Sequence, residues 1–206
     1  MAPEIRYNFD RTKPFYPIVT TYLIQLLGIK EVAVLGLPDL NRGFTLTPEV
    51  AQKSTQAERE ALEKSLQTML GPLSLKISDD AERLEIPLQF IAKELANHYD
   101  SLLGYNVQAA WYCIVMAHEV TVGKPYRDKS ELWEFLRHCR NAVAHNGKWN
   151  LRGNEPKYRA SWRGISLDQS FNGQNLFKTD DKSGTLELGD PIAFLHDIES
   201  KFPNMY

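Results

Sequence analysis

The segment Leu132–Gly147 carries the clearest helix start and stop signals in the chain. Asp128, three residues before Glu131, resembles a capping box at the N-terminus, and Asn146-Gly147 predicts a left-handed stop. Its apolar residues recur at spacings of four, three and four, which is typical of one helix face: Leu132, Leu136, Cys139 and Val143. Because that face must be buried, the segment favours a packed helical structure.

Glycine and proline residues divide the rest of the chain into further helices. We expect helices at about 14–29, 47–70, 78–103 and 106–122, and a last one from Asp190-Pro191. Ile18, Tyr22 and Leu26 form the apolar stripe of the first helix, and Pro87 predicts a kink or late start in the third. The helix 106–122 is apolar on most sides, so we expect it to be the most buried.

The character of the chain changes after Gly147. Residues 158–167 and 175–178 flank Asn172-Gly173, a pattern that predicts a β-hairpin, and 185–188 predicts a third short strand. We therefore expect a mainly α protein: a helical bundle with a small C-terminal β-hairpin and a terminal helix. The 206 residues fit a single domain, with the bundle at about 10–147 and the appendage at about 150–206.

Composition limits where the protein acts and what it binds. The net charge of −2 means that nucleic-acid binding must come from a local patch. Cys113 and Cys139 lie in apolar helical surroundings, which favours buried free thiols over disulfides or metal ligands. The first ten residues lack a signal-peptide pattern, and no apolar run approaches a membrane span. We expect a cytoplasmic protein with no membrane partner.

The polar side of the segment Leu132–Gly147 gathers groups that bind anions. Arg137, Asn141 and His145 recur at steps of four, Arg140 flanks this row, and His138 lies beside it. Cations crowded on one helix face repel each other, and a bound anion would relieve the repulsion. The planar guanidinium binds phosphate through two parallel hydrogen bonds. The alternative is a solvated polar face with an ordinary helix-ending histidine.

Arg140 and His145 could act on one phosphodiester. They are five residues apart, about 7.5 Å along a helix axis, a gap that the long arginine side chain can close. The helix offers a single acid–base histidine, whereas RNA transesterification ideally uses two groups. A two-fold homodimer that pairs two such helices would supply both.

The run Arg140-Asn141-Ala142-Val143-Ala144-His145 resembles the signature of the HEPN superfamily. That family has an α-helical bundle fold, is usually dimeric with two motifs meeting at the interface, and includes metal-independent endoribonucleases. The flanking residues look like small bacterial HEPN proteins of defence and toxin–antitoxin systems. The resemblance implies RNA as substrate, an antitoxin or defence-system partner, and no metal or cofactor.

The resemblance also implies roles for three catalytic residues. His145 would activate the ribose 2′-hydroxyl or protonate the leaving oxygen, and Arg140 would bind the scissile phosphate. Asn141 would orient the phosphate or the histidine. The products would carry a 2′,3′-cyclic phosphate and a 5′-hydroxyl. Some toxin members have a tyrosine two residues after the histidine, where this chain has Gly147, so control through that tyrosine is not expected.

Arg137, Lys148 and Arg152 are the candidate substrate-binding residues. Cations and aromatic residues alternate after the motif, a composition suited to single-stranded RNA: Lys148, Arg152, Lys157, Arg159 and Arg163 with Trp149, Tyr158 and Trp162. Equally, these aromatic residues could pack on the bundle.

The roles of two further histidines stay open, as do two functions other than RNA cleavage. His98 and His118 are more readily core or interface histidines than ligands, and His118-Glu119 is only a weak metal pair. A non-catalytic HEPN-like module that dimerises or binds RNA in a defence complex is the main alternative function. A nucleotide-binding or nucleotidyltransferase-partner role is a third.

Overall fold

The computed structural model describes residues 7–34, 55–58, 60–61, 73–76, 83–87, 102–179 and 182–206. The chain divides into two compact units, one of residues 1–27 with 103–206 and one of residues 28–102. Every residue of the predicted site belongs to the first unit. None of the helices in the described ranges is long and apolar enough to cross a membrane.

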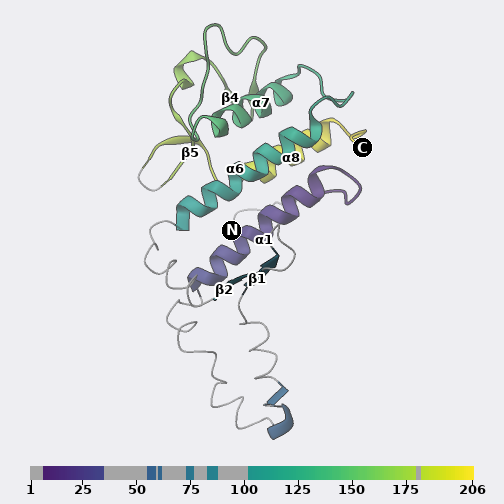
Figure 1. The fold of residues 1–206 in the computed structure, drawn as a ribbon. Coiled ribbons are helices and arrows are strands. Elements are labelled where there is room, and N and C mark those ends of the chain that lie inside the picture. Colours follow the sequence, from purple (N-terminus) through teal and green to yellow (C-terminus); the bar gives the residue numbers. More distant parts are fainter. Residues whose placement is uncertain are drawn as a thin grey trace, which may run out of the picture. The chain divides into compact units, whose positions relative to one another are not determined.

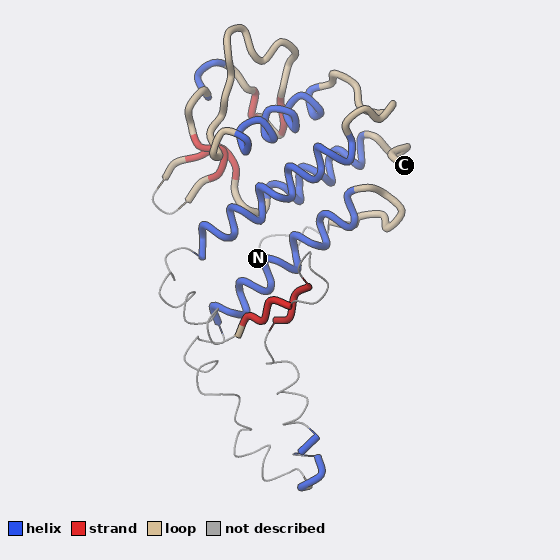
Figure 2. The backbone as a smooth tube through the Cα atoms, in the orientation of Figure 1, coloured by secondary structure: helices blue, strands red, loops and turns tan. Residues whose placement is uncertain are grey.

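The described residues form helices and several small sheets (Figures 1 and 2). The helices are α1 (Phe15–Val34), α6 (Leu102–Thr121), α7 (Glu131–Ala144), the 3-10 helix η2 (Gln169–Phe171) and α8 (Asp190–Lys201). The strands are β1 (Leu73–Lys76), β2 (Arg83–Ile86), β3 (Ser161–Trp162), β4 (Ile165–Ser166), β5 (Asn175–Phe177) and β6 (Gly184–Leu186). The protein is therefore a mixed helix-and-strand structure, not a pure helical bundle.

The first and last predicted helices are confirmed. In α1, Ile18 and Tyr22 are buried and Leu26 packs against the core, as the apolar stripe predicts. The helix continues to Val34, beyond the expected end. In α8, Pro191 lies in the first turn, where its missing N–H costs no helical hydrogen bond.

The predicted helix 78–103 does not begin at residues 78–81, whereas the alternative of a late start at Pro87 stays a prediction. Residues 83–86 form β2, which pairs antiparallel with β1 in the register Leu73↔Ile86 and Lys76↔Arg83. The sequences Leu-Ser-Leu-Lys and Arg-Leu-Glu-Ile both alternate with a period of two, which favours strands over a helix. Residues 88–101, with His98, lie outside the described residues, as does most of the predicted helix 47–70.

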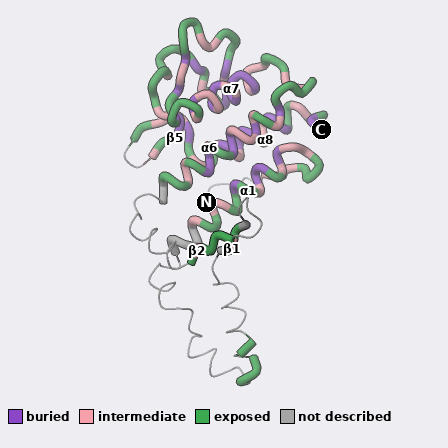
Figure 3. The backbone as a smooth tube through the Cα atoms, viewed as in Figure 1, coloured by how far each residue is buried: buried purple, intermediate pink, exposed green. Residues whose placement is uncertain are grey.

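Contrary to the expectation, α6 is not the most buried helix, because half of the residues of α7 and half of those of α8 are buried. Seven of the 14 residues of α7 are buried, whereas α6 buries one stripe and leaves Tyr112 45% exposed (Figure 3). The stripe of α6 consists of small and aliphatic residues: Ala109, Ala110, Cys113, Ile114 and Ala117. Cys113 and Cys139 are both buried free thiols, as predicted, and burial raises the pKa of Cys113 to about 12.

Phe135 of α7 lies at the centre of an aromatic cluster. Its ring centroid lies 5.8 Å from that of Trp149, 6.2 Å from that of Trp162 and 5.3 Å from that of Phe194. All four side chains are at least 96% buried. These rings come from α7, the following segment, β3 and α8, so the cluster joins α7 to the C-terminal part of the chain.

The predicted β-hairpin is displaced. The hairpin is β3–β4, which turns at Arg163 (φ 44°) and Gly164 (φ 84°). Two successive residues with positive φ form the tight turn that suits a two-residue hairpin. Asn172-Gly173 follows η2 instead, and β5 pairs in parallel with β6, close to the expected third strand.

The end of α7 is as the sequence predicts. His145 is the C-cap, Asn146 and Gly147 have φ of 58° and 72°, and the Gly147 N–H donates to the Ala142 carbonyl over 2.9 Å. This is the bond of a Schellman motif. The Gly147 carbonyl then accepts the Leu176 N–H over 2.7 Å, which ties the helix end to β5. The start differs, because Ser130 is the N-cap and the Asp128 carboxylate accepts the Ser130 N–H.

We expect Gly147→Ala to destabilise the fold. A methyl group at Gly147 would lie 2.3 Å from Trp111 Cζ2, in addition to the strain of a positive φ. Overlap and strain together should lower the free energy of unfolding in urea by about 2–4 kcal/mol. Gly123 has the same φ of 72° but open space around it, so Gly123→Ala should lose only about 1 kcal/mol. Equal losses would contradict this account.

Candidate functional site

The polar side of α7 faces an open pocket of about 500 Å³. The pocket is lined by the end of α6, the following turn and α7: His118, Val122, Gly123, Arg127, Asp128, Glu134, Arg137, Arg140 and Asn141. Three of the six predicted site residues, Arg137, Arg140 and Asn141, therefore line one pocket. The lining combines guanidinium, imidazole, amide and carboxylate groups, so it is polar and of mixed charge.

Arg140 is held by a carboxylate from α6. Its Nε donates to Glu119 Oε1 over 3.2 Å, and the same oxygen lies 3.3 Å from His118 Nδ1. The hydrogen bond from Arg140 is the main cause that lowers the pKa of Glu119. The Glu119 side chain is 46% exposed, and solvent-exposed ion pairs contribute little to stability. An incoming anion can therefore replace this carboxylate at Arg140.

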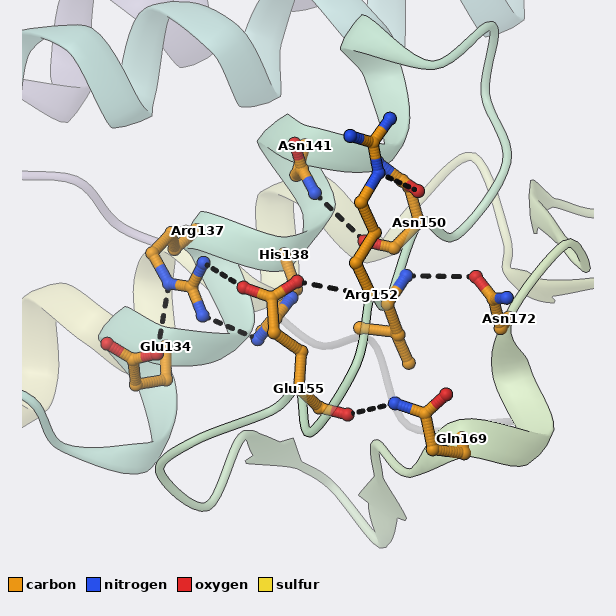
Figure 4. Close-up of polar contacts among 10 residues, drawn as sticks. Glu134, Arg137, His138, Asn141, Asn150, Arg152, Glu155, Gln169 and Asn172 are labelled. Atoms are coloured by element: carbon orange, nitrogen blue, oxygen red, sulfur yellow. Dashed lines mark hydrogen bonds and ion pairs between the residues drawn. The ribbon is translucent and has the colours of Figure 1, made fainter.

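Arg137 is held by more partners than Arg140, and Figure 4 shows the contacts of Arg137. Its guanidinium donates to Glu134 Oε2 over 3.0 Å and to Glu155 Oε1 over 3.3 Å, and its Nη2 lies 2.8 Å from His138 Nε2. Burial raises the pKa of Glu155, but hydrogen bonds from Arg152 and Arg137 outweigh it and lower the pKa. Carboxylates thus relieve the expected repulsion between these cations. An anion can bind an arginine here only by taking the place of a carboxylate.

Asn141 connects α7 to the loop after it. Its Nδ2 donates to the Asn150 carbonyl over 3.0 Å (Figure 4). Arg152 lies on this loop, where its Nε donates to Asn150 Oδ1 over 3.3 Å and its side chain is exposed. Asn141 therefore holds the loop that carries one predicted substrate-binding residue.

His145 does not line the pocket. The helix ends at Ala144, so the row of Arg137 and Asn141 stops before His145, which has the non-helical φ of −110° and is exposed. His145 is the C-cap and not a helical residue, because the left-handed residues Asn146 and Gly147 follow it and end the helix at Ala144. Lys148 is also exposed and lies opposite Asn175 in a β-bridge.

Two of the three aromatic residues proposed for base stacking belong to the core. Trp149 and Trp162 are 1% and 4% exposed. Tyr158 is exposed, and Lys129 Nζ lies 4.8 Å from the centroid of its ring. Arg159 and Arg163 pair with Glu131 and Asp197. The alternative in which the aromatic residues pack on the helices holds for both tryptophans.

His118 and Arg127 are pocket residues that the sequence analysis did not assign to a site. His118 was expected in the core or at an interface, but its 12%-exposed side chain lines the pocket beside Arg140. Arg127 Nη1 donates to the His118 carbonyl over 3.1 Å, which closes the end of α6. The adjacent pair His118-Glu119, in the last turn of the helix that precedes α7, was the sequence signal for this position.

No group of three or more metal-ligating side chains is found in the part of the chain that the structure describes. His138, expected beside the polar row, is 1% exposed instead.

Comparison with family models, with curated proteins and with solved structures finds no match to this chain. The site is therefore interpreted from its own residues and from the sequence motif.

We expect the protein to lose stability as the pH falls below about 6.5, the ordinary histidine pKa. Burial, and next the charge of Arg137, lowers the pKa of His138 in the folded state. The unfolded chain then binds a proton that the folded protein does not, so stability present above pH 6.5 is lost on acidification. Protonation would also remove the Nε2 acceptor that faces Arg137 Nη2.

The measurement is the free energy of unfolding in urea between pH 5 and pH 7.5. The loss attributable to one histidine is at most about 1.4 kcal/mol per pH unit. His138→Gln, which does not titrate, should show a shallower slope than the wild type. An unchanged slope in that variant would rule out His138 as a source of the pH dependence.

Proposed function

We propose that this chain is a HEPN-like, metal-independent endoribonuclease of a bacterial defence or toxin–antitoxin type. The observation that carries the proposal is that Arg137, Arg140 and Asn141 of the motif helix line one open pocket. The resemblance of Arg140-Asn141-Ala142-Val143-Ala144-His145 to the HEPN signature supplies the reaction class. Because the net charge is −2, RNA binding depends on local cations such as the arginines of this mixed-charge pocket.

Arg140 is the residue best suited to bind the scissile phosphate. Its side chain is 41% exposed, and its contact with Glu119 orients the guanidinium without burying it. Phosphate oxygens offer the same paired acceptors as a carboxylate and carry more charge in the transition state of cleavage. Arg137 is engaged by two carboxylates and a histidine, so it supports the pocket wall and contributes positive potential.

His145 transfers a proton in the proposed reaction, and Asn141 sets the position of the loop beside it. Lys148 and Arg152 are exposed cations on the segment that follows His145, where they would bind RNA phosphates outside the pocket. Because His145 does not line the pocket of Arg140, the proposed active form is a homodimer that brings two motif helices together.

Sedimentation tests the dimer. We expect a two-chain species of about twice 23.6 kDa at the protein concentration at which RNA is cleaved. A monomer at that concentration, with full activity, would exclude a composite site made by two copies.

The test of the activity is RNA cleavage in excess EDTA. The wild type should cleave structured or unstructured RNA, and His145→Ala and Arg140→Ala should each be slower by roughly 10²–10⁴-fold. Both side chains are partly or fully exposed, so both variants should fold. Lys178→Ala is the matched control, because Lys178 is also an exposed cation paired with a single carboxylate, Glu187, and it should cleave like the wild type.

Two outcomes would count against this mechanism: cleavage that requires a divalent metal, and full activity in His145→Ala. The second candidate function is a non-catalytic, dimeric RNA-binding module in a defence complex. The exposure of His145 outside the pocket favours it. Intact RNA in every reaction, together with binding that Arg140→Ala weakens, would select this second function.

A further inference from the structure

We infer that His118 is a second proton-transfer residue of this site, contributed by the same protomer as Arg140 and positioned by Glu119. The inference rests on the proposed ribonuclease function and deepens it. It supplies an acid–base imidazole beside the phosphate-binding arginine, where α7 offers only the buried His138 and, at its C-cap, His145.

The geometry places His118 opposite the motif helix. His118 belongs to the last turn of α6, and it lines the pocket together with Arg137, Arg140 and Asn141 of α7. Glu119 Oε1 joins the two helices, since it lies 3.3 Å from His118 Nδ1 and 3.2 Å from Arg140 Nε. The imidazole and the guanidinium thus share one carboxylate.

The charge of Glu119 fixes the tautomer of His118. The pKa of Glu119 is lowered, chiefly by the hydrogen bond from Arg140, so the carboxylate is ionised and can only accept hydrogen bonds. His118 Nδ1 must therefore carry the proton that points at it. This leaves Nε2 with a free lone pair, and no hydrogen-bond partner of Nε2 occurs within the described ranges. A carboxylate that orients a histidine through Nδ1 is the arrangement of a general base.

Burial, aided by two neighbouring arginines, keeps His118 neutral at pH 7. Burial lowers its pKa most, and the charges of Arg127 and Arg140 lower it further, whereas contact with Glu119 raises it. The pocket also contains Arg137, with Asp128 and Glu134 of opposite charge. The resulting pKa lies below 6.5, so the neutral base form predominates under physiological conditions.

The proton-transfer step follows from this arrangement. Arg140 exchanges Glu119 for an oxygen of the RNA phosphate, and Glu119 keeps its contact with His118. His118 Nε2 takes the proton of the ribose 2′-hydroxyl, the 2′-oxygen forms a bond to phosphorus, and the bond from phosphorus to the 5′-oxygen breaks. The leaving 5′-oxygen takes a proton from a second acid, the role that remains for His145. The proton balance closes when His118 returns its proton to solvent and His145 takes one back from solvent.

One experiment measures contact without cleavage. A 2′-O-methyl RNA oligonucleotide has no 2′-hydroxyl proton to remove, so it binds uncleaved, and NMR can follow the His118 ring protons during its titration. We expect saturable shifts of the His118 signals, lost in Arg140→Ala. His196 is the internal control. It lies on α8, where it packs edge-on against Tyr7 and Phe9, and its signals should not shift. Unshifted His118 signals at saturation would overturn the inference, whatever the ribonuclease assay gives.

The second experiment compares pH–rate profiles of cleavage in EDTA. His118→Gln should cleave roughly 10²–10⁴-fold more slowly at pH 7 and lose the rise in rate below pH 6.5 that deprotonation of His118 produces. Glu119→Gln should keep cleavage but shift that rise. A wild-type profile in His118→Gln would overturn the inference and leave the proposed function standing. A wild type that cleaves no RNA would reject the proposed function, and the NMR titration would still decide whether His118 contacts the bound strand.

Discussion

Burial of Phe135 within an aromatic cluster is the contact on which the rest of the site depends. Rings from three other segments surround Phe135, so α7 has one rotation about its axis that fills the core. At 100° per residue, Arg140 and Asn141 lie roughly 140–240° around the helix from Phe135. The packing that stabilises the helix therefore also directs these polar side chains away from the core and into the pocket.

Neighbouring carboxylates decide which of the arginines can exchange a partner for phosphate. Among the residues that the structure describes, Arg137 is bound by Glu134 and Glu155, and Arg140 by Glu119. The difference separates two roles on one helix: a guanidinium fixed by several partners supports the pocket, and one held by a single exposed carboxylate can exchange it for phosphate. Repulsion between neighbouring arginines, which first indicated an anion site, is relieved by these acids before any ligand binds.

Local patterns in the sequence were sufficient for the elements whose start and end depend on nearby residues. The apolar stripe of α1, the left-handed end of α7 at Asn146-Gly147 and the first turn of α8 at Pro191 are examples. Pairing between distant segments was not predictable in this way. Asn172-Gly173 looked like a hairpin turn, but the hairpin formed at Arg163-Gly164 because Trp162 joins the Phe135 cluster there. The place of His118 beside Arg140 likewise depends on how α6 meets α7, which helical periodicity does not specify.

The chemical ends of the RNA products test the central claim most directly. Attack by the 2′-oxygen, with no metal-activated water, leaves a 2′,3′-cyclic phosphate on one fragment and a 5′-hydroxyl on the other. Mass spectrometry of a short RNA incubated with the wild-type protein in EDTA distinguishes these ends. The account predicts both of them, and no cut where a single 2′-deoxy nucleotide precedes the scissile phosphate. Fragments with a 3′-hydroxyl and a 5′-phosphate would contradict it.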